Sequence, residues 1–275
     1  MAIKRVLNSY QPDHFTQAKI PPYMISRLTT WLLGAGAVFF FTIAQGAILE
    51  SWTFEDKDPF HHLAKEGEDP TIVPDPLNSK NQVMKSVLNT TSKRSGRSEV
   101  RWDKIKPGQE RWIGVKILVA GKNPMRQCLF QLGPINYMNS GVPGTGYFQI
   151  QRGDNSVAWM LRGFLERVNL PGGGHLPRIN LSAGPLQLGV WQKWVVHSKI
   201  STGSDGILEF WRGTQKVYEL KGRNCSVSPY FCPVKWGIYI GEDNHLTENA
   251  TAYFDNILLA DEHSSLTEIL KDLDQ

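Results

Sequence analysis

Three charged side chains on one predicted strand are the first candidates for chemistry in this sequence. The stretch Arg97-Ser-Glu-Val-Arg101 alternates, so Arg97, Glu99 and Arg101 are expected on one face of the strand. A guanidinium group matches the geometry of a carboxylate, and two of them on a sheet face could hold an acidic ligand. The alternative is a solvated outer face on which the arginines pair with Glu99. Taken alone, the strand is more typical of that solvated face, and the rest of the chain has to decide between the two.

The composition predicts a folded domain with a sizeable core. The chain has 275 residues, of which 41% are hydrophobic and 20% are charged. Its net charge of +4 is too small to indicate a nucleic-acid partner, but it suits an acidic polysaccharide. Nine Trp, eight Tyr and twelve Phe fit an all-β core or a surface on which sugars stack. Cys225 and Cys232 flank a short loop, and the sequence leaves open whether they form a disulfide.

The N-terminal part of the chain is typical of membrane targeting. Residues 1–30 form a polar leader with several basic side chains, and residues 31–49, WLLGAGAVFFFTIAQGAIL, carry no charge. This pattern predicts an apolar helix that is either the h-region of a signal peptide or an uncleaved membrane anchor. A buried core helix is the alternative. Both membrane interpretations predict a protein that is secreted or anchored with its domain outside the cytoplasm.

Short alternating segments with turn signals between them predict an all-β sandwich or jelly roll. Strands are expected over residues 48–54, 82–88, 97–101, 111–119, 127–132, 147–151, 157–161, 191–201, 206–211, 215–220, 235–240 and 251–260. Long loops are expected over residues 58–80, 133–146 and 169–189. Residues 264–273 predict a short helix capped by Ser264 or Ser265. The β domain would thus span residues 50–262, followed by a helical tail over 263–275.

The order of motifs in the second half of the chain resembles a known family. The motifs are WQKW at 191–194, GILEFWRG at 206–213, VKWGIY at 234–239 and AYFDNI at 252–257, with RSEVR upstream at 97–101. Together they resemble the heparin-lyase and glucuronan-lyase group of polysaccharide lyases, and more distantly the alginate lyases. The resemblance covers roughly residues 50–262 and implies a concanavalin-like β-jelly-roll sandwich.

The resemblance also implies a substrate groove lined by three motifs. The R-S/T-E-x-R motif of alginate-type lyases matches Arg97–Arg101, and their K-x-G-x-Y motif matches Lys235–Tyr239. The tyrosine of that motif is the family's proton-transfer residue, which would be Tyr239. Their Q-x-H motif is matched only by Gln131, because Gly133 stands where the histidine should be.

The chemistry implied by the resemblance is β-elimination on a uronic acid. This reaction removes the proton on C5 and expels the 4-oxygen, so the carboxylate beside C5 must be neutralised. Arg97 or Arg101 together with Gln131 could hold that carboxylate. Tyr239 could act as the acid, or as both acid and base. Glu99 and Lys235, which lie within the first and third motifs, are expected to contact the substrate.

Histidines elsewhere in the chain could replace the missing one. His197 lies on a predicted strand beside Lys193 and Lys199, and we expect it to face the groove as a catalytic residue. His175 lies in a glycine-rich loop that could fold over the substrate and bind it. An ordinary structural role is the alternative for each.

The implied reaction requires no cofactor, although a structural Ca²⁺ ion is common in jelly rolls of this kind. Glu55 and Asp255 would be its oxygen ligands, and a plain surface carboxylate pair is the alternative. The partner expected is an acidic polysaccharide, with the membrane as a second partner if residues 31–49 remain uncleaved. The sequence does not indicate an oligomeric state.

Two other functions compete with the lyase. One is a carbohydrate-binding jelly roll without catalytic activity. The other is a glycoside hydrolase, which needs two carboxylates at set separations. The signature E-x-D-x-x-E of such hydrolases is absent from the sequence.

Overall fold

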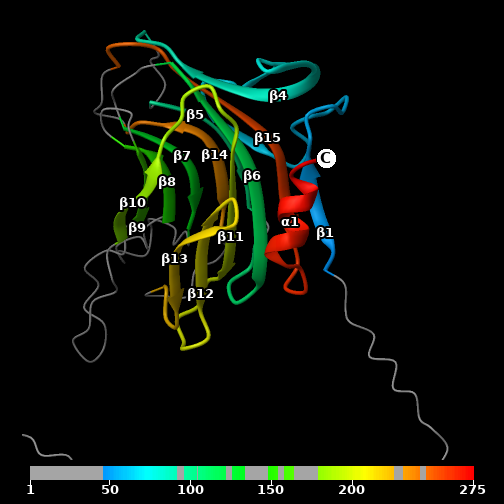
Figure 1. Cartoon of the computed structure of the whole chain (residues 1–275), viewed down its shortest axis with the longest axis vertical. Helices are drawn as coiled ribbons and strands as arrows, with labels where there is room; N and C mark the ends of the chain where they lie inside the picture. Colours follow the sequence, from blue (N-terminus) through cyan, green and yellow to red (C-terminus); the bar gives the residue numbers. More distant parts are fainter. Residues whose placement is uncertain are drawn as a thin grey trace, which may run out of the picture. The chain divides into compact units, whose positions relative to one another are not determined.

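The computed structural model describes residues 46–91, 96–103, 105–121, 126–133, 148–153, 158–163, 179–225, 232–241 and 246–275. Within these ranges the chain forms two antiparallel sheets and one short helix (Figure 1). The all-β sandwich predicted from the alternating segments is therefore confirmed. The sequence predicts an apolar helix within residues 31–49. Residues 31–45 of this segment lie outside the described residues, and Ile48 and Leu49 at its end belong to a strand.

The first sheet has eight strands. In spatial order they are β13 (Gln215–Lys221), β12 (Ile207–Arg212), β11 (Gln192–Lys199), β6 (Glu110–Ala120), β15 (Ala250–Ala260), β4 (Asn78–Leu88) and β3 (Thr71–Asp75), and β1 (Ile48–Trp52) also pairs with β15. Because β1 begins at Ile48, the sandwich starts two residues before the domain boundary expected at residue 50.

The second sheet has seven strands, and it carries the motif strands singled out above. In spatial order they are β10 (Ile179–Pro185), β9 (Ala158–Gly163), β8 (Phe148–Arg152), β7 (Gln127–Leu132), β14 (Val234–Tyr239), β5 (Arg97–Trp102) and β2 (Ala64–Gly67). Strand β14, which is late in the sequence, lies between β5 and β7. The three motifs are therefore adjacent in space.

Aromatic side chains link the two sheets across the core. Trp52 of the first sheet lies 5.4 Å from Trp236 of the second, and Trp194 of the first lies 5.2 Å from Trp159 of the second, measured between ring centroids. All four rings are buried. Such pairs add about 0.5–1.5 kcal/mol each beyond the burial of their area. They hold the inner faces together, so the alternate side chains of β14 and β5 must point outward.

Helix α1 (Leu266–Asp272) covers the outer face of the first sheet. Ser265 caps it and forms a capping box with Glu268, which settles the choice between the two predicted caps. Ile269 and Leu273 pack on Val195 and on neighbouring residues of the sheet. Among the described residues, no helix is both long and apolar enough to cross a membrane.

Two predicted loops contain strands. Residues 58–80 hold β2, β3 and the start of β4, and residues 169–189 hold β10. β2, β3 and β10 are sheet-edge strands of four to seven residues. Edge strands carry polar residues and tolerate proline, as Pro74 in β3 illustrates, so their sequences resemble loops. The side chains of Cys128, Cys225 and Cys232 are buried.

Candidate functional site

The outward face of the second sheet collects the charged residues of β5 and β14. In the register of this pair, Tyr239 lies opposite Arg97, and Lys235 lies opposite Arg101. Directly paired residues of antiparallel strands project to the same side. Lys235 also pairs with Gln131 of β7, which extends this face across a third strand. The structure therefore brings together most of the residues singled out in the sequence: Arg97, Glu99, Arg101, Gln131, Lys235 and Tyr239. We call this surface the polar face.

Glu66 of the edge strand β2 joins three cations of the polar face. Its carboxylate accepts hydrogen bonds from Arg97 Nη1 at 2.8 Å and from Lys235 Nζ at 2.8 Å, and it also pairs with Arg101. Burial alone would raise the pKa of Glu66. The hydrogen bond from Lys235 and the charges of Lys235, Arg101 and Arg97 outweigh burial and lower that pKa below its ordinary value. Glu66 is therefore ionised and balances part of the positive charge here.

Sequence reasoning missed Glu66, because this residue lay in the predicted loop over 58–80. The local signal was weak, since β2 has only four residues, of which two are exposed and two are half-buried. Only the pairing of β2 with β5, in which Glu66 lies opposite Glu99, shows that its carboxylate can reach the arginines.

Glu99 is a buried carboxylate beneath these cations. Its side chain is only 1% exposed, and its Oε1 accepts a hydrogen bond of 2.6 Å from Gln131 Nε2. Burial raises the pKa of Glu99 to about 7, although the charges of Lys235 and Arg97 and the bond from Gln131 oppose this rise. The sequence predicted that Glu99 contacts substrate. Its carboxylate is covered in the structure, so it would influence a bound substrate only through neighbours such as Gln131.

Glutamine side chains continue the polar face beyond Glu99. Gln149 Nε2 of β8 donates to Gln131 Oε1 at 3.3 Å, and Gln151 donates in turn to Gln149. Each amide N–H donates to the next group on the way to Glu99, so the three glutamines form one chain of hydrogen bonds with a single direction across β8, β7 and β5. The alternating Gln149-Ile-Gln151 was the sequence signal for these two residues, and it was overlooked.

A pH-dependent stability is expected from Glu99. The folded protein holds its proton more tightly than the unfolded chain, so stability falls as pH rises from the ordinary pKa of 4.5 to about 7. The variant Glu99→Gln keeps the acceptor for Gln131 and cannot ionise. Its unfolding free energy relative to wild type should therefore increase by up to about 3 kcal/mol across this pH range. Urea unfolding of both proteins at pH 4.5, 6 and 7.5 measures the difference. A constant difference would contradict the raised pKa.

A hollow of about 200 Å³ lies beside Tyr239 on the same sheet. It is lined by Arg126, Cys128, Gln149, Gln151, Arg162, Tyr239, Ile240 and Gly241. The guanidinium carbon of Arg97 lies 4.5 Å from the centroid of the Tyr239 ring, within the range of a cation–π contact. The phenol therefore stands at the border between this amide-lined hollow and the cations around Glu66.

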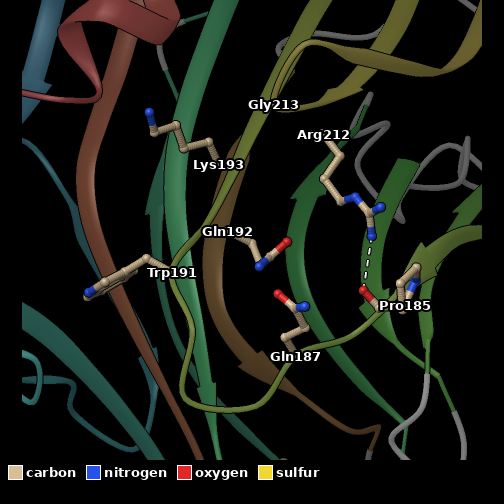
Figure 2. Close-up of a pocket in the computed structure, with 7 residues that line it drawn as sticks. All are labelled: Pro185, Gln187, Trp191, Gln192, Lys193, Arg212 and Gly213. Carbon is tan, nitrogen blue, oxygen red and sulfur yellow. Dashed lines mark hydrogen bonds between the residues drawn. The ribbon is translucent and has the colours of Figure 1, made fainter.

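A second hollow, of about 260 Å³, lies elsewhere in the domain. Figure 2 shows Gln187 and Gln192 turned toward each other in it, with Trp191 pointing away. Arg212 donates to the carbonyl of Pro185 at 3.0 Å (Figure 2). No carboxylate, histidine or tyrosine is among its described lining residues. Lys193 is the lining residue that could transfer a proton, and its ammonium group is paired with Asp274.

The expectation that His197 faces the groove is wrong. His197 lies on β11 of the first sheet, where its ring stacks on Trp112 with the centroids 3.9 Å apart. Glu110 and Glu209 contact its two ring nitrogens at 2.8 and 3.0 Å. The alternating pattern of β11 was read correctly, but that pattern does not say which sheet a strand joins. His175, the other expected histidine, lies outside the described residues.

Glu55 and Asp255 do not fit a calcium site. Asp255 is buried, and its Oδ2 lies 2.7 Å from Lys116 Nζ and accepts a hydrogen bond from Asn81. The ammonium group already neutralises this carboxylate, and it would repel a cation beside it. Glu55 instead accepts a hydrogen bond from the backbone of Gln82.

Comparison with known proteins identifies the family. The model of the polysaccharide lyase family matches residues 53–258, which is most of the chain. The chain belongs to the polysaccharide lyase family. The matched range includes every residue of the polar face and also Glu66. A search of the curated proteins found no match.

Solved structures of polysaccharide lyases share this fold. The endo-β-1,4-glucuronan lyase of the fungus Trichoderma reesei is 15% identical with a TM-score of 0.61, and the alignment covers 80% of this chain and 98% of that one. An alginate lyase of Aplysia kurodai is 11% identical with a TM-score of 0.54, over 78% and 98% of the two chains. An alginate lyase of a Chlorella virus is 14% identical with a TM-score of 0.53, over 78% and 100%. At these identities the likeness concerns the fold.

Proposed function

We propose that this polysaccharide lyase cleaves a polymer containing uronic acid by β-elimination at the polar face. The observation that carries this proposal is the meeting of Tyr239 with the cations of β5 and β14 on one surface. A polyuronate presents a carboxylate beside every C5–H bond that the reaction breaks. The similar solved structures include lyases of glucuronan and alginate, which are polyuronates.

Different residues of the polar face would neutralise the substrate carboxylate and transfer the proton. Arg97 and Arg101 are the half-exposed cations of the polar face, and they would hold the substrate carboxylate. Its neutralisation favours the enolate-like intermediate that forms when the C5 proton leaves. The phenolate form of Tyr239 would take the C5 proton and then, as the phenol, return it to the departing 4-oxygen. The C4–O bond of the glycosidic linkage breaks in this step, and a C4–C5 double bond forms. Gln131 and Lys235 fix the cations and the amide chain in place.

One assay tests this proposal against its alternatives. The protein is incubated with glucuronan, alginate and heparin, and the absorbance of the unsaturated uronate product is followed. The lyase gives the chromophore and new reducing ends in equal amounts. A glycoside hydrolase would give reducing ends without the chromophore. Retained binding of sugar without either product would indicate a carbohydrate-binding domain and overturn the proposal.

Glu66 should weaken the binding of anionic substrates. It compensates the charge of Arg97, Arg101 and Lys235, with which a substrate carboxylate must also interact. The variant Glu66→Gln is expected to lower KM for a polyuronate by roughly three- to tenfold at low ionic strength, and high salt should remove the difference. Steady-state kinetics at two salt concentrations measure this.

Glu68→Gln is the matched control, because Glu68 lies two residues further along the same segment and is half-buried. Its KM should stay at the wild-type value. If Glu66→Gln raised KM instead, Glu66 would be needed to position the cations rather than to compete with the substrate.

We also propose that the N-terminal segment exports the domain. The uncharged segment over residues 31–49, which follows a basic leader, supports this proposal. Its last two residues, Ile48 and Leu49, form the start of β1. The mature protein is then either secreted after cleavage near Gly46 or held in the membrane by the segment. N-terminal sequencing and membrane fractionation distinguish these outcomes. An intact chain recovered only in the cytosol would contradict both.

A further inference from the structure

We propose that Glu50, His61 and His62 bind one Zn²⁺ ion at the margin of the first sheet. Each of these side chains offers a ligand atom, and the three atoms all lie within 4.8 Å of one another. The cluster shares no residue with the polar face. Glu50 belongs to β1, and the two histidines lie in the connection from β1 to β2. The site would therefore serve the structure of the domain rather than the elimination reaction.

The hydrogen bonds of His61 prepare its ring for a metal ion. His61 Nδ1 lies 3.0 Å from the carbonyl oxygen of Asp58. A carbonyl oxygen can only accept, so Nδ1 carries the proton and Nε2 keeps its lone pair. Metal-ligating histidines commonly donate their other N–H to a backbone carbonyl in this way, which fixes the tautomer and the ring orientation.

The core of the domain holds the backbone of this segment in place. The indole N–H of Trp52 donates to the carbonyl oxygen of His61 at 3.2 Å, and Trp52 is only 2% exposed. The backbone N–H of His61 also bonds to the carbonyl of Asp58, which closes a turn. A ligand on a segment anchored in this way is preorganised, because little of its backbone freedom is left to lose on binding.

His62 supplies the second imidazole and faces the carboxylate of Glu50. Its Nδ1 lies 3.7 Å from Glu50 Oε2, which is too long for a hydrogen bond and close enough for two ligands of one ion. Ligand atoms of a tetrahedral zinc site are about 3.3 Å apart when each lies about 2.0 Å from the metal. The side chain of His62 is 56% exposed, so it is free of close packing and can rotate to bring its ligand atom to that separation from Glu50 Oε2. Its backbone φ of 62° is unusual for a residue other than glycine.

The donor set selects the kind of metal. Two imidazole nitrogens and one carboxylate oxygen suit Zn²⁺, whereas Ca²⁺ and Mg²⁺ prefer oxygen ligands alone. Water would supply the fourth ligand, since the site is open to solvent at His62. The ion would tie β1 of the first sheet to the segment that leads into β2 of the second. It would thereby support the strand that carries Glu66.

Calorimetry on the full-length chain tests the proposal. The protein is stripped with a chelator, and Zn²⁺ is titrated into it at pH 7.5. We expect one site with a Kd in the micromolar range or below, and a rise in Tm on adding Zn²⁺. The variants His61→Ala and Glu50→Gln should bind at least tenfold more weakly. His62→Asn should do the same, and asparagine tolerates the left-handed backbone at this position.

His263→Ala is the matched control, because His263 Nε2 lies 3.8 Å from Glu262 Oε1 in an exposed pair much like that of His62 and Glu50. It should bind Zn²⁺ as the wild type does. The circular dichroism of each metal-free variant checks that it is folded. The proposal is overturned if the wild type binds Zn²⁺ only at millimolar concentration, or if folded His61→Ala and His62→Asn bind it as tightly as the wild type.

Discussion

Replacing Tyr239 with phenylalanine should reduce kcat on a polyuronate by a factor of about 10² to 10⁴, with little change in KM. Phenylalanine keeps the ring on which the guanidinium of Arg97 rests, 4.5 Å from the ring centroid, and removes only the hydroxyl. The carboxylate-holding cations would stay in place, so the ground-state binding of substrate would persist. The proton on C5 would lose its acceptor and the 4-oxygen its donor. Steady-state kinetics from the absorbance of the unsaturated product measure both constants.

Tyr253→Phe serves as the control for this change. Tyr253 lies on β15 of the first sheet and also has a cation over its ring, Lys85 Nζ at 6.0 Å from the centroid. The same chemical change away from the polar face should leave kcat unaltered. A Tyr239→Phe enzyme that kept more than a tenth of its wild-type kcat would remove Tyr239 from the proton-transfer step.

The second large effect is expected at Gly237, between Lys235 and Tyr239. Gly237 lies opposite Glu99 with a φ of +139°, and a Cβ atom there would come within 2.2 Å of the Ser98 carbonyl oxygen and 2.6 Å of the Glu99 Cα. Both are backbone atoms of β5, so the two strands would have to separate. We expect Gly237→Ala to lower the unfolding free energy by about 2–4 kcal/mol, from overpacking and backbone strain together.

The same substitution should also abolish lyase activity. Separation of β14 from β5 moves Tyr239 and Lys235 away from Arg97 and Glu66, and a misplacement of about 1 Å already costs a large factor in rate. Urea unfolding and the lyase assay on the same preparation measure the two effects.

Gly222→Ala isolates the contribution of the backbone conformation. Gly222 has a φ of +102°, and the atom nearest to a Cβ added there would be 4.0 Å away. That variant should show only the backbone cost and keep its activity. If the two variants were equally stable, the close approach of β14 to β5 would not be what restricts position 237 to glycine.

The local pattern of the sequence determined the fold class and most of the strands near the site. Side chains of a strand alternate between two faces, so the placement of Arg97, Glu99 and Arg101 on one face follows from their spacing alone. The capping of α1 by Ser265 is local in the same sense, because it depends on a residue only three positions away. The order of motifs indicated the family, and the family match confirmed it.

Only the tertiary structure decided how these strands meet. The alternation of β11 is the same whichever sheet it joins, and strand order placed His197 on the first sheet, away from the polar face. Glu66 reached the arginines through the pairing of an edge strand that resembles a loop. The burial that raises the pKa of Glu99 also comes from neighbours distant in the chain. Strand order, edge pairing and burial depend on contacts between residues far apart in sequence, and no local pattern encodes them.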